Sequence, residues 1–148
     1  MKTKYALKAL ALLASGPPGE PMLIADIAER EDIPKKFLEA ILAELKQHGF
    51  VRSRKGRGGG YLLAQGPDSI TLASIVRVLD GPIAPVPCLS RTAYRRCEGC
   101  KDEATCGVRL ALREAHAASI AVLESTTLAE MVARQQAASS PVALRYSI

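Results

Sequence analysis

Four cysteines are the side chains of this sequence best suited to chemistry. Cys88, Cys97, Cys100 and Cys106 are the only cysteines of the chain, and they share one short stretch. Thiolates are the usual ligands of structural zinc and of iron–sulfur clusters. In a cytosolic protein, clustered cysteines indicate a metal site or a redox sensor more often than a disulfide framework. The pattern Cys-x8-Cys-x2-Cys-x5-Cys does not separate zinc from iron–sulfur, and a thiol–disulfide switch or free surface thiols remain alternatives.

Positive charge surrounds these cysteines and would lower thiol pKa values and offset the charge of a thiolate cluster. The basic residues concerned are Arg91, Arg95, Arg96 and Lys101. We expect the nearby carboxylates of Asp102 and Glu103 to be solvated. His116 lies too far along the chain from Cys106 to join a cluster there without a partner chain. No Ser/His/Asp set suited to catalysis stands out, so we predict that the protein is not an enzyme.

A second group of residues combines basic charge with glycine. Two short β-prone runs flank the glycine-rich turn 56–60, which predicts a hairpin. Arg54, Lys55 and Arg57 would lie along or inside a DNA minor groove, and Gly58 and Gly59 would let the backbone approach another surface closely. The alternative is an ordinary solvated basic hairpin. A nucleotide-binding P-loop is excluded, because the turn lacks a Gly-Lys-Ser/Thr ending and precedes a strand.

The elements that position these residues are mainly helical. Apolar residues at helical spacing predict helices over 3–15, 23–31, 35–48, 72–79, 105–124 and 128–136. Two short helices joined by a tight turn and followed by a basic hairpin have the order of a winged helix-turn-helix. The second of them would enter the major groove by its N-terminal end, which carries Lys35, Lys36 and Phe37.

Composition supports this interpretation. The chain has 148 residues, of which 48% are hydrophobic and 24% charged, and a net charge of +5, which is typical of a globular domain and consistent with a polyanionic partner. No apolar run is long enough for a membrane span, and the N-terminal apolar run is too short for a signal peptide, so we expect a cytoplasmic protein without membrane contact. The helix over 105–124 has little of its own chain to pack on. We therefore expect it to pack on a partner subunit and to cross back over the N-terminal unit.

The predicted fold class is mainly α: a winged helix-turn-helix with a small β-hairpin wing and a long C-terminal dimerisation helix. The predicted boundaries are a DNA-binding domain over 1–80, a cysteine-rich sensor loop over 81–104, a dimerisation helix and terminal helix over 105–136, and a flexible tail over 137–148.

Five segments, in this order along the chain, resemble a known family. They are KYALKAL (4–10), IADIA (24–28), IPKKFLE (33–39), KGRGGGY (55–61) and LAEMV (128–132). The sequence resembles the IscR–NsrR–CymR (Rrf-two) family of bacterial transcription regulators over residues 2–134. The resemblance implies a homodimer with crossed dimerisation helices and palindromic double-stranded promoter DNA as the partner.

Several members of that family hold an iron–sulfur cluster on three cysteines before the long helix and on a fourth, variable ligand. By this resemblance, Cys100-x5-Cys106 matches the last two cysteines. The place of the family's first cysteine is Tyr94, and Cys97 would take that role. Arg109 stands where one branch has a histidine ligand, and Lys4 stands near the position of an acidic ligand in another. Cys88 is left as the fourth thiolate.

Together these observations predict a sequence-specific DNA-binding transcription regulator. Its promoter affinity would be controlled by an iron–sulfur cluster, 2Fe–2S or 4Fe–4S, or by redox state, at the cysteine loop. The alternatives are a regulator that binds zinc or switches between thiol and disulfide with no metal, and a zinc-stabilised adaptor that binds protein.

Overall fold

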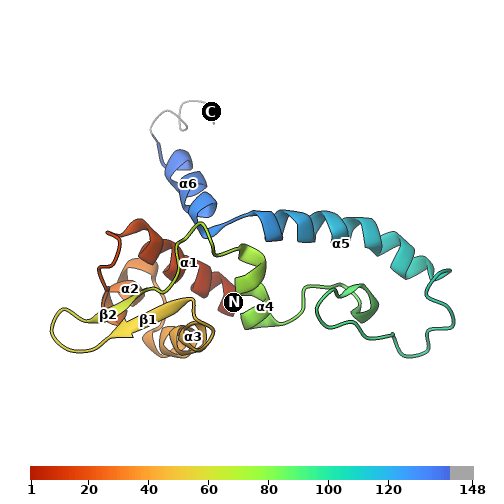
Figure 1. Ribbon diagram of the computed structural model, residues 1–148, viewed down its shortest axis with the longest axis horizontal. Coiled ribbons are helices and arrows are strands. Elements are labelled where there is room, and N and C mark those ends of the chain that lie inside the picture. The colour runs from red at the N-terminus through yellow and green to blue at the C-terminus, as the bar shows by residue number, and fades with distance from the viewer. Residues whose placement is uncertain (141–148) are drawn as a thin grey trace.

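The computed structural model describes residues 1–140 and shows a mainly helical chain with one two-stranded hairpin. The predicted fold class is confirmed. Figure 1 shows an elongated molecule in which a compact N-terminal unit (residues 1–80) lies at one end and a long helix extends away from it. The elements in chain order are α1 (Lys2–Ser15), α2 (Ile24–Glu31), α3 (Lys35–Gln47), β1 (Val51–Arg54), β2 (Gly60–Leu63), α4 (Leu72–Asp80), the 3-10 turn η1 (Pro87–Leu89), α5 (Gly107–Ser125) and α6 (Leu128–Ala138).

Helix α1 lies at the centre of the core. It packs against α2, α3, α4 and α6. Ala6 and Ala9 are fully buried on α1 and let neighbouring helices approach closely. Burying each large aliphatic side chain around them contributes about 1.5–3 kcal/mol. The fully buried ones include Leu10, Ile27, Leu38, Leu42, Leu45, Ile75 and Leu128.

The turn between α2 and α3 is set by a left-handed residue and a buried anchor. Asp32 ends α2 at φ 51°, and Ile33 is buried directly after it. Pro34 then stands at the N-cap of α3, so α3 begins where its apolar spacing predicts. At the other end, His48 is the C-cap and Gly49 adopts φ +76°, a conformation that glycine adopts without steric cost.

The hairpin pairs β1 with β2 in antiparallel register, with Val51 opposite Leu63 and Arg54 opposite Gly60. It is joined to the rest of the N-terminal unit by a third extended residue, Met22. The backbones of Met22 and Tyr61 exchange two hydrogen bonds, each with an N···O distance of 2.8 Å. The wing is therefore held by the connection between α1 and α2 as well as by its own strands.

Residues 81–106, here called the cysteine loop, connect α4 to α5 and fold back beneath α5 (Figure 1). Their one regular element is η1, where Cys88, Leu89 and Ser90 are buried. Helix α5 packs against α4 and η1, yet Ile120 is its only buried residue. Most of the surface of α5 is therefore exposed.

Helix α6 returns to the N-terminal unit and packs on α1. A capping box starts it: Thr127 accepts from the Glu130 amide, and Glu130 accepts from the Thr127 amide. The helix runs two residues beyond its predicted end, so residues 137 and 138, predicted to begin a tail, are helical. Ser139 is the C-cap of α6, and residues 141–148 of the predicted tail lie outside the described residues. None of the helices in the described part of the chain combines the length and apolar character needed to span a bilayer.

Candidate DNA-binding surface and cysteine site

The N-terminal end of α3 presents the residues predicted to face DNA. Lys35, Lys36 and Phe37 are all exposed, and the Phe37 residue is 64% exposed. The next residue, Leu38, is fully buried and fixes the helix on the core. No side chain caps the first turn of α3, so its free N–H groups face outward, where they favour a phosphate. The arrangement gives cations, an aromatic surface and a helix N-terminus on one exposed edge.

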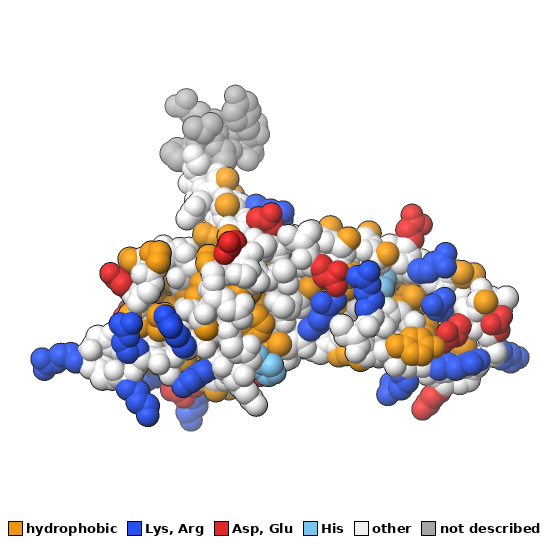
Figure 2. Space-filling view, viewed as in Figure 1, with side chains coloured by type: hydrophobic (Ala, Val, Ile, Leu, Met, Phe, Trp, Pro, Cys, Tyr) orange, Lys and Arg blue, Asp and Glu red, His pale blue; other side chains and the backbone are white. Residues whose placement is uncertain are grey.

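The wing presents the second predicted set. Arg54, Lys55 and Arg57 are exposed, and Figure 2 shows Lys and Arg side chains projecting from the end of the molecule that holds the hairpin. Gly58 is exposed and adopts φ +73° with open space around it. Gly59 is buried, and a Cβ there would overlap the carbonyl oxygen of Arg54. Gly59 is thus required by the turn itself, whereas Gly58 leaves room for another surface.

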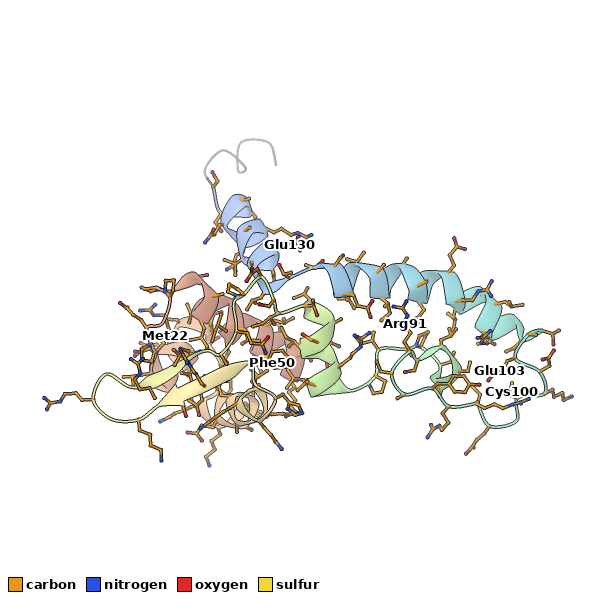
Figure 3. The ribbon with its side chains drawn as sticks, in the orientation of Figure 1. Met22, Phe50, Arg91, Cys100, Glu103 and Glu130 are labelled. Atoms are coloured by element: carbon orange, nitrogen blue, oxygen red, sulfur yellow. The ribbon has the colours of Figure 1, made fainter. Side chains whose placement is uncertain are left out.

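Met22 is a residue that sequence reasoning missed. Its backbone bridge to Tyr61 fixes the wing relative to the start of α2 (Figure 3 labels Met22 beside the hairpin). Leu23 follows as the N-cap of α2 and is 54% exposed. The only signal in the sequence is the apolar run Met22-Leu23-Ile24 between a proline and the helix, which is compatible with an extended residue but names no partner.

All four cysteines line one cavity of about 450 Å³, here called the cysteine cavity. Cys88 comes from η1, Cys97 and Cys100 lie on one tight turn in which the Cys100 amide donates to the Cys97 carbonyl at 3.2 Å, and Cys106 is the N-cap of α5. All four are free thiols. Cys88 is buried and the other three are half-buried, so the thiols face a shared space that is open to solvent on one side.

The charges around the cysteine cavity are arranged by specific contacts. Burial raises the pKa of the Cys88 thiol, and the adjacent Cys97 side chain raises this pKa further, while Arg109 acts in the opposite direction. Arg96 donates to the backbone carbonyls of Cys100 and Lys101, both at 3.1 Å. These contacts tie the turn together with backbone acceptors and leave the sulfur atoms free.

The two carboxylates of the cysteine loop are engaged in hydrogen bonds. Asp102 accepts from the Thr105 hydroxyl at 2.8 Å and from the Ala104 amide at 3.1 Å, and the Thr105 contact in particular holds its pKa below the ordinary value. Glu103 is half-buried and accepts from the Tyr94 hydroxyl, which raises the pKa of Tyr94. Asp102 is exposed as expected, whereas the expectation that Glu103 is simply solvated is wrong, because Tyr94 folds onto it.

Arg109 lines the cysteine cavity from the first turn of α5. Its Nε atom is buried without a hydrogen-bond partner; within residues 1–140, only the His116 Nε2 shares this condition. A buried unpaired donor is costly. The first N–H groups of α5 open beside it, at the positive end of the helix dipole. Arg109 therefore adds a positive charge to this side of the cavity, while its Nε atom is shielded from solvent.

The four cysteines supply the donors for a metal group at this cavity. Among residues 1–140, no three His, Cys, Asp or Glu side chains lie close enough together to hold a single metal ion. Thiolates are ligands both of tetrahedral zinc and of iron–sulfur clusters. The four sulfur donors, with the positive charge of Arg109 beside them, fit the donor set of either group.

A model of the Rrf2 family, described as iron-dependent transcriptional regulators, matches residues 1–134. The chain belongs to the Rrf2 family. An rrf2-like HTH-type transcriptional regulator of Rhodobacter capsulatus is 44% identical over 135 residues, covering 89% of this chain and 90% of the relative. The HTH-type transcriptional regulator NsrR of Bacillus subtilis is 34% identical over 134 residues, covering 90% of this chain and 89% of the relative.

The solved structures agree with this assignment. CymR, the global cysteine regulator of B. subtilis, superposes with a TM-score of 0.75 at 31% identity and covers 90% of this chain and 95% of that one. The resemblance found in the sequence is confirmed. As an Rrf2-family member the protein is a DNA-binding transcription regulator and not an enzyme.

Proposed function

We propose that this Rrf2-family regulator is a homodimer that binds palindromic promoter DNA, and that an iron–sulfur cluster at the cysteine cavity sets its affinity. The observation that carries the proposal is the convergence of all four cysteines on one cavity, beside the unpaired donor of Arg109. Soft sulfur donors beside a positive charge are properties that suit a thiolate-held cluster.

DNA contact is assigned to two exposed surfaces of the N-terminal unit. Lys35, Lys36 and Phe37 begin the helix that enters the major groove, and the free amides of that helix end bind a phosphate. The wing places Arg54, Lys55 and Arg57 against the neighbouring backbone or minor groove, with Gly58 and Gly59 shaping the turn. Both surfaces are basic, which suits the phosphate charges of duplex DNA.

Dimerisation is supported by one face of α5. Five small or β-branched residues repeat at alternating spacings of three and four and are all exposed; this set, here called the exposed stripe, comprises Val108, Ala111, Ala115, Ala118 and Val122. Such a spacing is the seam of two helices that pack together, and alanine lets the backbones approach closely. A two-fold dimer built on this seam presents two recognition helices, which matches a palindromic site.

Control of DNA affinity is assigned to the cysteine loop. Cys88, Cys97, Cys100 and Cys106 would hold the cluster, and the positive charge of Arg109 would offset the negative charge of the thiolates. When bound, the cluster supplies iron that reacts with small oxidants or is lost when iron is scarce. The loop joins α4 directly to α5, so ordering the four cysteines fixes the connection between the DNA-binding unit and the dimer seam.

A second candidate rests on Cys88 and Cys97, which line the same cavity and are near enough for Cys97 to raise the pKa of the Cys88 thiol. A peroxide could oxidise these two thiols to one disulfide and be reduced to water or an alcohol, with no metal involved. In that case the cysteine loop would be locked by a covalent bond instead of by a cluster. Single-ion zinc binding by the same thiols is a further alternative, which metal analysis separates from the cluster.

Anaerobic purification of the full chain tests these alternatives. We expect a brown protein whose iron and sulfide contents match and whose affinity for a palindromic upstream DNA differs between the loaded and the cluster-free forms. DNA affinity should fall steeply with salt. Stoichiometric zinc in a colourless protein would exclude the iron–sulfur proposal, and a loss of two hydrogens in the mass after peroxide treatment would favour the disulfide.

Single replacements define the ligands. Cys88→Ser, Cys97→Ser, Cys100→Ser and Cys106→Ser should each reduce iron content. Glu98→Ala is the matched control, because Glu98 lines the same cavity with oxygen instead of sulfur and is exposed. A cluster retained after Cys88→Ser would remove Cys88 from the ligand set and require a ligand from elsewhere or from the partner chain.

A further inference from the structure

Glu124, near the C-terminal end of α5, holds two arginines from different parts of the chain. Its Oε1 accepts from Arg77 Nη2 at 2.6 Å, and its Oε2 accepts from Arg91 Nη1 at 3.0 Å. The side chains of Arg77 and Glu124 are 26% and 36% exposed, whereas that of Arg91 is 65% exposed. The Glu124 carboxylate therefore joins a partly buried ion pair with Arg77 to a more exposed ion pair with Arg91.

The three residues come from the three parts that a sensor has to connect. Arg77 belongs to α4 of the N-terminal unit, Glu124 to α5, and Arg91 to the cysteine loop, three positions after Cys88. Figure 3 shows Arg91 beneath α5, between the N-terminal unit and the tip that carries Cys100 and Glu103. Within residues 1–140, the other two ion pairs, Lys2–Glu44 and Lys8–Glu31, lie inside the N-terminal unit. Arg91–Glu124 is thus the one ion pair of the described chain that involves the cysteine loop.

We propose that Glu124 is a positioning residue that transmits the state of the cysteine cavity to the DNA-binding unit through Arg91 and Arg77. This inference rests on the proposed function, because it needs two states of the cavity. Cys88 and Leu89 are buried in η1, and Ser90 closes the following turn by accepting from the Ala93 amide at 3.0 Å. Drawing Cys88 toward a ligand moves this short turn, and Arg91 lies inside it.

The path continues from Glu124 into the DNA-binding unit. Arg77 lies in α4, which packs on α1, and α1 in turn packs on the recognition helix α3. The start of α4 is also joined through the backbone to the segment that follows α5. The Leu72 amide donates to the Thr126 carbonyl at 2.9 Å, and Thr71 pairs with Thr127. A shift of α5 relative to the cysteine loop therefore reaches α4 both at its start and in its last turn.

The test compares the DNA affinities of the iron-loaded and cluster-free forms of each variant. The readout is the ratio of these two affinities, because a merely structural role would change both forms equally. Natural couplings of this kind give ratios of about 5 to 150. We expect Glu124→Gln and Arg91→Gln to bring the ratio close to one while iron content stays at the wild-type level, and Arg91→Lys to restore part of it.

Glu114→Gln is the matched control, since Glu114 is an exposed carboxylate on the same helix and makes none of the ion pairs found in the described chain. It should keep the wild-type ratio. If Glu124→Gln fails to fold, Arg91→Gln still decides the question, because Arg91 is largely exposed. A wild-type ratio in Arg91→Gln with full iron overturns the coupling alone. Equal affinities of the two forms in the wild-type protein overturn the proposed function, and the coupling with it.

Discussion

The backbone of Gly60 lies directly against the carbonyl group of Met22. A Cβ atom on Gly60 would overlap the Met22 carbonyl oxygen and carbon, and Gly60 adopts φ +139°, a region that other residues rarely enter. The neighbouring Tyr61 exchanges both of its backbone hydrogen bonds with Met22. The last glycine of the turn is therefore fixed by the connection between α1 and α2, and the wing cannot move away from that connection without losing two hydrogen bonds.

Gly60→Ala should destabilise the fold and displace the wing. The new methyl group meets backbone atoms that cannot move aside, and the φ angle is strained for alanine, so we expect a loss of about 1–3 kcal/mol of unfolding free energy. Urea denaturation followed by circular dichroism measures this loss. DNA affinity should fall as well, because the basic residues of the wing would leave their positions.

Gly58→Ala is the control for this effect. Gly58 also has a positive φ, but nothing lies within 4 Å of the place of its Cβ. The Gly58→Ala variant should therefore lose only about 1–2 kcal/mol of unfolding free energy, from the left-handed backbone conformation. The two strands should stay paired. Equal losses for the two variants would show that the contact with Met22 is not what demands glycine at position 60.

Arg57→Ala should weaken DNA binding without changing the thermal stability of the protein. The side chain is exposed at the tip of the wing, so its removal leaves the core intact. The expected loss is about 1–3 kcal/mol if the guanidinium reads a base edge, or a smaller loss with a salt slope reduced by about one if it only neutralises a phosphate. Fluorescence anisotropy at several salt concentrations distinguishes the two cases.

Arg113→Ala on the exposed surface of α5 is a matched arginine outside the wing, and it should leave the affinity unchanged. Lys55→Ala tests the neighbouring wing cation. Unaltered DNA affinity in both Arg57→Ala and Lys55→Ala would mean that the hairpin does not contact DNA.

The helices could be predicted because local pattern and core agree. In α3, four of the five apolar residues at helical spacing are buried, whereas Phe37, expected in the core by the same spacing, is 64% exposed. Pro34 and Gly49 mark the ends of the helix. The hairpin follows from the glycine-rich turn in the same way. Ion pairs between residues far apart in the sequence leave no such periodic pattern. Glu124 is 47 residues from Arg77 and 33 from Arg91. The neighbouring residues therefore do not distinguish these charged side chains from solvated ones.

The cysteine site likewise combines features that the sequence predicts with contacts that only the fold shows. Spacing predicts that the thiols lie near one another, and the fold places them around one cavity. The unpaired Arg109 donor could not be predicted, because whether a guanidinium atom is buried depends on how the loop covers α5. Tyr94 and Glu103 are nine residues apart on an irregular loop, where no regular spacing indicates which side chains meet.

Arg109→Leu should keep or raise the thermal stability of the cluster-free protein, and it should speed the loss of iron from the loaded protein. In the empty protein, it removes a buried donor without a partner, a group that costs about 1–3 kcal/mol, so the thermal stability should stay equal or rise. In the loaded protein, it would remove the positive charge that offsets the thiolates, so iron should pass faster to a chelator.

The measurement is the rate of colour loss after chelator addition, together with thermal melting of the cluster-free form. Arg113→Leu, one turn further along α5 and exposed, controls for the loss of a positive charge. A chelation rate that remains at the wild-type value in Arg109→Leu would show that Arg109 does not contact the bound group.

Glu124→Gln should change how stability depends on pH. Its hydrogen bond with Arg77, assisted by Arg91, holds the pKa of the Glu124 carboxyl below the ordinary value of 4.5. Because this pKa is lower in the folded state, the pair stabilises the fold fully above the unfolded-state value and loses this contribution as the pH falls through the folded-state pKa. The difference in unfolding free energy between wild type and variant should be constant near neutrality and shrink on acidification. Glu114→Gln should show no such trend.

Ala115→Glu should separate the dimer into monomers. Ala115 is the central residue of the exposed stripe, so a two-fold seam would bring the two new carboxylates together without partners, and an uncompensated buried charge costs about 3–5 kcal/mol. Ala117→Glu is the matched control, because position 117 is exposed on another face of the same helix and carries the same change in helix propensity and charge. Sedimentation velocity should show a monomer for Ala115→Glu and a dimer for Ala117→Glu. DNA affinity links this result to function: a monomer reaches only one half of a palindrome, so Ala115→Glu should lose far more affinity for the full site than for an isolated half-site. A dimer that survives Ala115→Glu, or an equal dissociation of both variants, would place the seam elsewhere than on the exposed stripe.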